Sequence, residues 1–424
     1  MPDPTAAERH RRHLVDDVLA WWTAHGPDEE HGGVLTCWDN RSATLVSTDK
    51  YTWSQGRWAW LTARVAAAAQ RGVLGVDPEP FLEHSERTAR FVREHALLPD
   101  GRVAFVTDRA GTPREPRPGS GLATSVFADL FAALGFAGLA QVRPEGGWGA
   151  TAEDLLHRAA GTIAAGAVPA DPYPVPEGHR AFAFPMILLG VGEQVHRATG
   201  SAESAALVRA AAGELAGHVG ADHDVAEMPA DDPRDRDGLV ARHRTPGHTL
   251  EALWFAHHAR DLIAGTGLDT PQVLAPIALR ACETGWDAEH GGLLRYTDRD
   301  GGPPRGSRTG HPYEELVAGT WDTKLWWPHA EAMYTTTLLA AGTAGTAETG
   351  LAAWAERLET YTYATFPEGP GREWTQIRAR DGSPDDRTVA LPVKDPFHVA
   401  RALLLLVEQA GTTAAPPITE RNTS

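Results

Sequence analysis

A histidine and a glutamate at the start of one helical segment have the spacing of an acid–base pair. In RTPGHTLEALWFA, Pro246 and Gly247 open a helix, His248 lies in its first turn, and Glu251 follows at i+3 on the same face. A carboxylate there can fix the tautomer of an imidazole and raise its basicity, as a general base requires. The alternative is that Glu251 only caps the helix.

An arginine beside tryptophans marks a second segment, TDKYTWSQGRWAW. Arg57 lies near Trp53 and Trp60 on the predicted helix, and its planar guanidinium suits paired hydroxyls or a carboxylate. Stacking of an arginine on tryptophan in the core explains the pattern equally well. We take Arg57 as a catalytic candidate and Trp53 as a substrate-binding candidate.

The segment WDTKLWWPHAEAM combines aromatic rings with titratable groups. Trp326 and Trp327 are adjacent and diverge on a helix, and His329 and Glu331 follow them. Aromatic faces with nearby carboxylates suit a sugar, whose C–H faces stack while its hydroxyls need acceptors. We expect these four residues to bind substrate, although at least one tryptophan can belong to the core.

A second catalytic histidine is predicted in VKDPFHVARALLLL. His398 follows a proline at the start of an apolar helix, where a histidine needs either a structural hydrogen bond or a catalytic role. His248 and His398, at the starts of two helices, could converge with Arg57 on one substrate. From the same segment we expect Lys394 to contact that substrate.

No metal or cofactor is predicted. The chain has 2 cysteines and no HxxxH or HExxH pair on these helices, and no glycine-rich strand–loop–helix motif for phosphate.

Helices must position these residues. Apolar residues at helical spacing predict twelve helices, near Thr5–Thr23, Thr52–Arg71, Pro80–Leu97, Gly121–Leu139, Ala152–Ala165, Arg180–Thr199, Ala202–Val219, His248–Ala264, Pro271–Thr284, Asp322–Ala341, Ala347–Thr365 and Pro396–Gln409. Odd-numbered helices have one solvated face, whereas even-numbered ones are apolar or aromatic around much of their circumference.

Six outer and six inner helices describe an all-α (α/α)6 barrel, with a funnel at the N-terminal ends of the inner helices. We predict one barrel domain over 1–411 and a disordered tail over 412–424. Two separate bundles are the alternative, but the proline-rich stretches mark no single midpoint. Short hairpins are expected at 32–43, 101–111, 291–301 and 372–382, and EEHGGVL (29–35) and AEHGGLL (288–294) indicate an internal repeat.

Composition excludes several classes of protein. The 424 residues carry a formal charge of −17, which disfavours nucleic acid, and no apolar run is long enough to span a bilayer. The N-terminal residues lack the apolar stretch of a secretory signal, so we expect a cytoplasmic protein with a small-molecule partner. The sequence allows a homodimer.

Read together and in this order, TDKYTWSQGRWAW, PGHTLEALW, DTKLWWPHAEAM and KDPFHVARALLL resemble the N-acylglucosamine 2-epimerase family over about residues 26–406. The resemblance implies an (α/α)6 barrel and a cofactor-independent isomerase that moves the proton at C2 of a sugar through an enediolate. It implies that His248 and His398 exchange acid and base roles and that Arg57 holds the substrate. We expect Glu251 to orient His248, and Trp326 or Trp327 to form the sugar platform.

Departures within the family select a branch. Mannose isomerases and cellobiose epimerases carry a further histidine where this chain has Met186 and Ile187, and cellobiose epimerases place a tryptophan where it has Val393. His329 in WWPHAEA is also similar to the acylglucosamine branch. We therefore expect an N-acylated monosaccharide, with an aldose–ketose isomerase acting on mannose or a related free hexose as the alternative. A glycosidase using two carboxylates, such as Glu251 and Glu331, and a sugar-binding barrel without activity are further alternatives.

Overall fold

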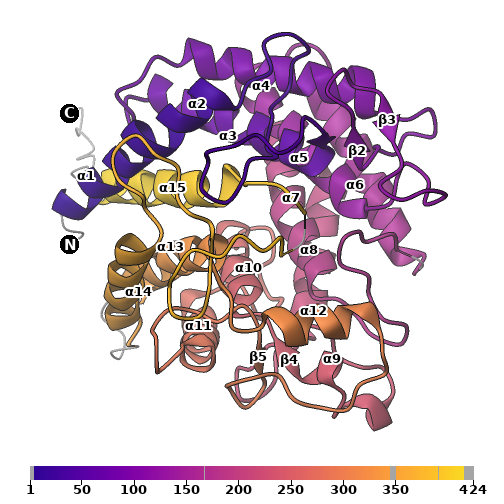
Figure 1. Ribbon diagram of the computed structural model, residues 1–424, viewed down its shortest axis with the longest axis vertical. Helices are drawn as coiled ribbons and strands as arrows, with labels where there is room; N and C mark the ends of the chain where they lie inside the picture. The colour runs from indigo at the N-terminus through magenta and orange to yellow at the C-terminus, as the bar shows by residue number, and fades with distance from the viewer. Residues whose placement is uncertain (1–3, 167, 344–349, 390, 415–424) are drawn as a thin grey trace, which may run out of the picture.

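Two concentric rings of helices make up the protein. The structure is a computed structural model, and it describes residues 4–166, 168–343, 350–389 and 391–414 (Figure 1). The inner ring consists of α3 (Thr52–Gln70), α5 (Val126–Val142), α7 (Ala183–Thr199), α10 (Pro246–His258), α13 (Trp326–Gly342) and α15 (Phe397–Ala414). Each of these packs against the next, and α15 packs against α3, so the ring is closed. The predicted all-α (α/α)6 barrel is confirmed.

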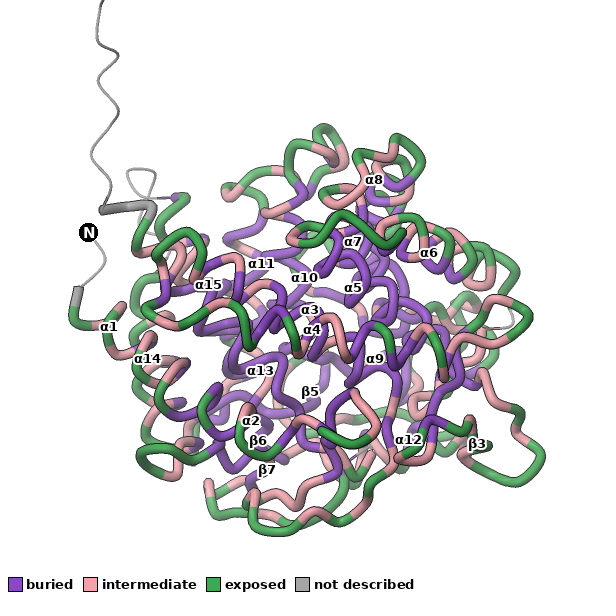
Figure 2. Tube along the Cα trace, turned by 90° about the horizontal axis from the view of Figure 1, so that it is seen from above, coloured by how far each residue is buried: buried purple, intermediate pink, exposed green. Residues whose placement is uncertain are grey.

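The outer ring covers the inner one. Its first member is a continuous rod of α1 (Pro4–Arg12), a π-helical stretch (His13–Leu19) and α2 (Ala20–His25). The others are α4 (Glu79–Phe91, extended by a π-helical turn), α6 (Trp148–Ala164), α8 (Ala202–Ala216), α11 (Pro271–Gly285) and α14 (Leu351–Thr365). The buried stretches of chain lie at the centre and the exposed ones at the periphery (Figure 2).

Sequence pattern explains which helices lie inside. Nearly every residue of α5 is buried, as its unbroken apolar sequence requires, whereas α4 buries Phe81, Leu82 and Ala89 on one face and exposes its charges. None of the described helices is both long enough and apolar enough to cross a membrane.

The twelve predicted helices are all present, with shifted ends. α5 starts at Val126 rather than Gly121, and α10 ends at His258 rather than Ala264. Two short helices were not predicted, α9 (Leu239–Arg242) and α12 (Pro312–Thr320). The predicted tail lies outside the described residues from position 415 on, while 412–414 complete α15.

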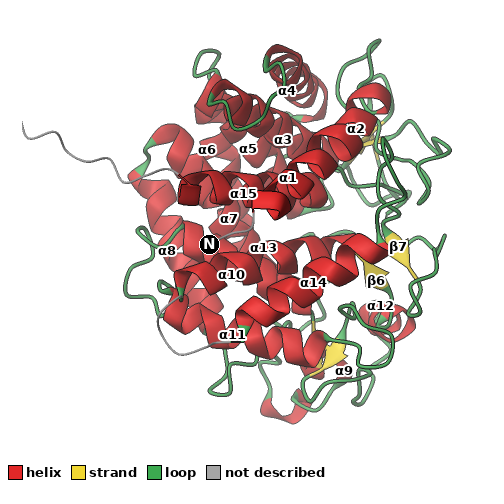
Figure 3. Cartoon of the chain, turned by 90° about the vertical axis from the view of Figure 1, so that its left-hand side faces the viewer, coloured by secondary structure: helices red, strands yellow, loops and turns green. Residues whose placement is uncertain are grey.

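Three short strands lead directly into inner helices. β1 (Lys50–Tyr51) precedes α3, β4 (His243–Arg244) precedes α10, and β6 (Lys324–Leu325) precedes α13. They pair antiparallel with β2 (Val106–Thr107), β5 (Thr297–Asp298) and β7 (Ile377–Arg378), and β3 (Pro113–Arg114) adds to β2. The strands and long loops gather at one end of the helices (Figure 3).

The hairpins were predicted only in part. Within 291–301 and 372–382 the strands β5 and β7 pair with the strands before α10 and α13, not within their own segments. These pairings fix the starts of the inner helices.

The internal repeat is present in the structure. Single bridges join Pro27 to Val34 and, 259 residues later, Trp286 to Leu293. In the first copy Asp28 binds Lys50 and Arg109, and in the second Asp287 binds Lys324 and Arg380. Each buried aspartate thereby ties a hairpin to the strand that precedes an inner helix.

Two glycines allow the inner helices to approach closely where the candidate residues lie. A Cβ at Gly56 would lie 1.9 Å from the carbonyl oxygen of Phe131, so only glycine lets α3 pack against α5 at this point. A Cβ at Gly247 would lie 2.6 Å from the indole of Trp327. The glycines before Arg57 and His248 therefore serve packing that positions those side chains.

Candidate active site

A cavity of about 170 Å³ opens at the loop-rich end of the barrel, and all six inner helices line it. Seven of the ten predicted site residues, from four of these helices, are among its lining: Trp53, Arg57, His248, Glu251, Trp326, Trp327 and His398. The remaining three, Glu331, His329 and Lys394, are not. The structure thus brings together residues that are up to 345 positions apart, from Trp53 to His398.

His248 is held by a carboxylate that sequence reasoning missed. Its Nδ1 donates a hydrogen bond to Oε1 of Glu227 at 2.8 Å, which leaves Nε2 with the lone pair in the neutral imidazole. Burial disfavours the imidazolium, but the charge and hydrogen bond of Glu227 outweigh it, and the pKa of His248 is raised above its ordinary value. Glu227 is buried, and its pKa is lowered by the neighbouring His248 despite that burial.

His398 has the same arrangement. Its Nδ1 donates to Oε1 of Glu331 at 2.8 Å. The second oxygen, Oε2 of Glu331, accepts a hydrogen bond from Nε1 of Trp254 at 2.7 Å. Both candidate histidines therefore have Nδ1 fixed by a buried carboxylate, which is the tautomer that a base acting through Nε2 requires.

The indole of Trp327 lies beside both imidazoles. Its ring centroid is 5.2 Å from that of His248 and 5.6 Å from that of His398. The two candidate acid–base groups therefore share one aromatic neighbour.

The expectation that Glu251 orients His248 is wrong. Its Oε1 accepts a hydrogen bond from Nη2 of Arg401, and the same guanidinium nitrogen donates to Oε1 of Glu331 at 2.6 Å. The i+3 spacing places Glu251 on the cavity side of α10, but the guanidinium of Arg401 lies closer to it than the imidazole does. Arg401 is buried and compensates the charges of two carboxylates, which explains an arginine on an apolar helix.

Arg57 lies with its guanidinium over aromatic rings at the wall of the cavity. Its Cζ is 4.0 Å from the ring centre of Phe131 and 5.3 Å from that of Trp53. The nearest carboxylate is Asp395, whose Oδ2 lies 3.9 Å from Nη1 of Arg57. Arg57 therefore stacks on aromatic side chains, as one interpretation of the sequence expected, and it also lines the cavity.

Several polar atoms at the cavity lack a partner within the described part of the chain. These atoms are Nε1 of Trp53, Nε1 of Trp326, Nε of Arg57 and Oδ2 of Asp395. Buried polar groups without a hydrogen bond cost free energy, so a lining of this kind is suited to a ligand that carries several hydroxyl or carbonyl groups.

Two residues expected to bind substrate lie elsewhere. Nδ1 of His329 donates to the carbonyl oxygen of Leu325 at 2.6 Å, and its Nε2 accepts from the backbone N–H of Leu293 at 2.8 Å. Nζ of Lys394 donates to the backbone oxygens of Asn40 and Trp374, each at 2.7 Å. Both side chains are buried and stabilise loops around the cavity, so their predicted contact with substrate is not seen.

Glu331 also lies behind the lining, where it binds His398 rather than facing the cavity. Conversely, Glu227, Arg295 and Asp395 line the cavity but were not predicted. Glu227 and Arg295 belong to loops, where neither helical periodicity nor a motif marks them. In the sequence, the only signal for Asp395 is its position directly before Pro396.

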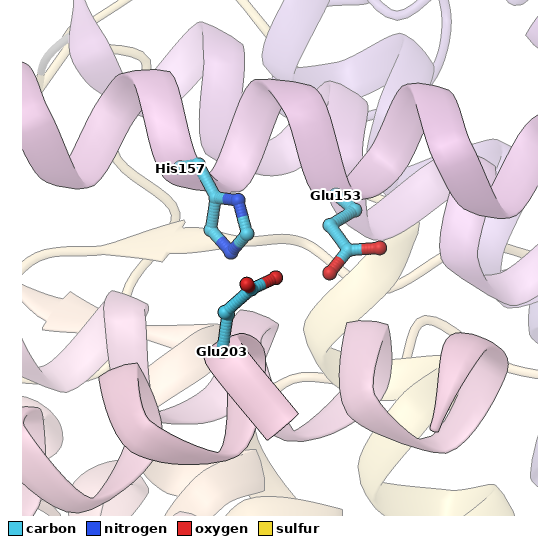
Figure 4. Close-up of side chains that lie close together, drawn as sticks. All are labelled: Glu153, His157 and Glu203. Carbon is cyan, nitrogen blue, oxygen red and sulfur yellow. The ribbon is translucent and has the colours of Figure 1, made fainter. Parts of the chain in front are cut away.

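Among the residues that the structure describes, two groups of side chains have the composition of a metal site. Glu251, Glu331 and His398 form one, but the Arg401 guanidinium already bridges its two carboxylates. The other joins Glu153 and His157 of α6 to Glu203 of α8 on the outer ring (Figure 4). That second group contributes nothing to the lining of the cavity.

A larger cavity, of about 430 Å³, occupies the opposite end of the same helices. Trp254 and Arg401, which bind Glu331, reach its wall, and Phe131 and Ile187 line both cavities. We place the candidate site in the smaller cavity because both fixed imidazoles and Arg57 line it.

Comparison with known proteins agrees with the sequence motifs. The family model for N-acylglucosamine 2-epimerase (GlcNAc 2-epimerase) matches residues 195–402. The N-acylglucosamine 2-epimerase of Bos taurus is 28% identical over 409 residues, which cover 93% of this chain and 89% of the bovine protein. The enzyme of the same name from Mus musculus is 26% identical over 416 residues, covering 94% and 90%.

Solved structures share the fold. The cellobiose 2-epimerase from Spirochaeta thermophila DSM 6192 superposes with a TM-score of 0.74 at 16% identity, covering 97% of this chain and 98% of that one. A D-mannose isomerase gives 0.72 at 14% identity, covering 96% and 98%. A family 76 glycoside hydrolase from a bovine Bacteroides thetaiotaomicron strain gives 0.55 at 11% identity, covering 97% and 79%.

Proposed function

Because the chain belongs to the N-acylglucosamine 2-epimerase family, we propose that it is a sugar 2-epimerase that interconverts N-acylglucosamine and N-acylmannosamine. The reaction removes the proton at C2, next to the aldehyde of the open-chain sugar, and returns a proton to the opposite face.

The observation that carries the proposal is the pair of imidazoles that line one cavity beside Trp327. Inversion at C2 needs a base on one face of the carbon and an acid on the other. His248 and His398 reach the cavity from different helices, and each has Nδ1 bound to a buried carboxylate. One Nε2 takes the C2 proton while the other, protonated, supplies a proton to the opposite face, and the roles exchange in the reverse direction.

Arg57 and Trp327 act on the rest of the substrate. Removal of the C2 proton places negative charge on O1, and the guanidinium of Arg57 stabilises that oxyanion. The face of Trp327 stacks on the C–H groups of the sugar and keeps C2 between the two imidazoles.

Cavity size and lining favour an N-acylated monosaccharide. A volume of about 170 Å³ is below the ~300–1,000 Å³ of pockets for drug-sized ligands, so a disaccharide fits poorly. Phe127, Phe184, Met186 and Met228 form an apolar wall that can accept the methyl group of an acetamido substituent. The rings of Phe127 and Phe184 are stacked, with their centres 5.6 Å apart.

The ion pairs of Glu251 and Glu331 with Arg401 argue against a glycosidase. That reaction needs two carboxyl groups flanking the scissile bond, one of them free to donate a proton. Glu251 and Glu331 are both bound to Arg401, and Glu331 does not line the cavity.

The test is proton NMR in D₂O with N-acetylmannosamine, N-acetylglucosamine, mannose and glucose in separate samples. We expect the H2 signal of the N-acetylated sugars to disappear as the 2-epimer forms, and His248→Gln and His398→Gln to abolish this. The exposed His290→Gln serves as the matched control and keeps wild-type rates. Formation of a ketose would instead identify an aldose–ketose isomerase, and absence of H2 exchange in every sample would contradict the proposal.

A further inference from the structure

One carboxylate at the cavity has no part in the proposed proton transfer at C2. Asp395 precedes Pro396 at the start of α15 and is 6% exposed. Its Oδ1 accepts the backbone N–H of Phe397 at 2.9 Å, and its own N–H donates to Oε1 of Gln376 at 2.9 Å. Asp395 is therefore held in place as the N-terminal cap of an inner helix.

The other carboxylate oxygen is turned toward the reacting groups. Oδ2 of Asp395 lies 3.4 Å from Nε2 of His398 and 3.9 Å from Nη1 of Arg57, and it has no hydrogen-bond partner among the described residues. A carboxylate oxygen only accepts hydrogen bonds when ionised, so a ligand that satisfies it must present a hydroxyl or an N–H at this point.

The proposed epimerisation requires a step that the two histidines do not cover. Hexoses in water are cyclic hemiacetals, and the C2 proton becomes acidic only when the ring opens to the aldehyde. Opening requires a base at the anomeric hydroxyl, O1–H, and a proton donor at the ring oxygen, O5.

We propose that Asp395 is the ring-opening base, an inference that rests on the proposed function. Its Oδ2 takes the proton of O1–H, and the electrons of that bond form the C1=O1 double bond. The C1–O5 bond breaks with its electron pair on O5, which takes a proton from the imidazole that is protonated. The proton on Oδ2 returns to the imidazole pair through Nε2 of His398, and closure of the product ring is the reverse.

The position of Asp395 explains this assignment. Arg57 holds O1 in the proposed C2 chemistry, and Asp395 is the carboxylate next to Arg57. The atom that loses its proton in ring opening is therefore the same atom that the guanidinium then stabilises as the carbonyl oxygen.

Catalysed interconversion of α and β anomers measures ring opening directly, without any change at C2. NMR exchange spectroscopy of N-acetylmannosamine with the wild-type enzyme should show anomer exchange above the uncatalysed rate. In Asp395→Asn, which keeps the helix cap and the size of the side chain but removes the base, we expect the enzyme-driven anomer exchange and kcat to fall by ~100-fold or more, with KM nearly unchanged.

Three further variants define the result. Asp395→Ser also caps the helix and should lose anomer exchange likewise, while Asp395→Glu restores part of it. Asp386→Asn, an exposed aspartate of the same loop, is the matched control and keeps the wild-type rate.

The possible failures are distinguishable. Wild-type anomer exchange in folded Asp395→Asn or Asp395→Ser, or no catalysed exchange in the wild type, would overturn the role of Asp395. Anomer exchange without loss of H2 from any sugar would instead contradict the proposed epimerisation and leave the ring-opening step supported.

Discussion

Nδ1 of His248 and Oε1 of Glu227 lie 2.8 Å apart, in a hydrogen bond between a residue of α10 and a loop residue 21 positions earlier. A second bond of the same kind joins Nδ1 of His398 to Oε1 of Glu331. In both cases the carboxylate is buried and the imidazole lines the cavity. Both imidazoles are thus held in the same way: a buried carboxylate accepts the hydrogen bond from Nδ1, and Nε2 remains available for proton transfer.

Replacing Glu227 by Gln should shift the pH dependence of the reaction. Glu227 raises the pKa of His248, so in the direction in which His248 is the acid, activity is lost only as the pH rises through that raised value. Without the charge of Glu227 the imidazolium is less stable, and we expect the basic limb of the kcat/KM profile to move to lower pH. The kcat/KM of both directions, measured from pH 5 to 10, checks this; an unmoved basic limb in Glu227→Gln would contradict it.

The same ion pair has a consequence for folding. The pKa of His248 is raised in the folded protein, so the pair contributes stability that is fully present below the ordinary value of 6.5 and is lost as the pH rises through the raised pKa. Urea unfolding should therefore show a difference between wild type and Glu227→Gln that is larger at pH 6 than at pH 9. A difference independent of pH would mean that the pair adds no pH-linked stability.

Local patterns predicted the helices and the residues they carry into the cavity. Apolar periodicity separated inner from outer helices, and the starts of α3, α10, α13 and α15 placed Arg57, His248, Trp327 and His398 correctly. The hydrogen-bond partners could not be predicted in the same way. Glu227 is a loop residue that binds His248, and Arg401 on α15 binds Glu251 on α10. Such pairings depend on how the helices pack into a closed ring, and the apolar periodicity of a single helix carries no information about that packing.

Glu331 should be needed for catalysis although it does not line the cavity. It fixes Nδ1 of His398, and Glu331→Gln removes the charge that holds the imidazole in its tautomer. We expect kcat to fall by about 10²–10⁴-fold, the contribution typical of a general acid–base, with little change in KM. Steady-state kinetics on the folded variant measure this. Trp254→Phe, which removes only the hydrogen bond to Oε2 of Glu331, is the matched comparison and should lose far less activity.

Trp327 is expected to act mainly through substrate binding. Phe at this position keeps an aromatic face but reduces the stacking area, so KM should rise by about two- to fivefold, given that a whole ring contact of this kind contributes ~0.5–1.5 kcal/mol. Ala would also remove the ring that contacts both His248 and His398, and kcat should fall as well. Initial-rate kinetics separate the two effects, with Trp286→Phe, at a half-buried tryptophan beside the outer helix α14, as the control. An unchanged KM in Trp327→Ala would exclude the platform role.

His329 should behave as a structural residue, in contrast to the role that its motif suggested. Burial lowers the pKa of its imidazole to about 3, so the ring stays neutral and does not transfer protons at working pH. Replacement by Ala leaves the N–H of Leu293 without its acceptor, and we expect the free energy of unfolding to fall by at least ~1–3 kcal/mol. Urea denaturation measures the loss, while KM of the folded variant should stay near the wild-type value. A raised KM at unchanged stability would mean that His329 contacts the substrate after all, and that the loop it now supports moves when the sugar binds.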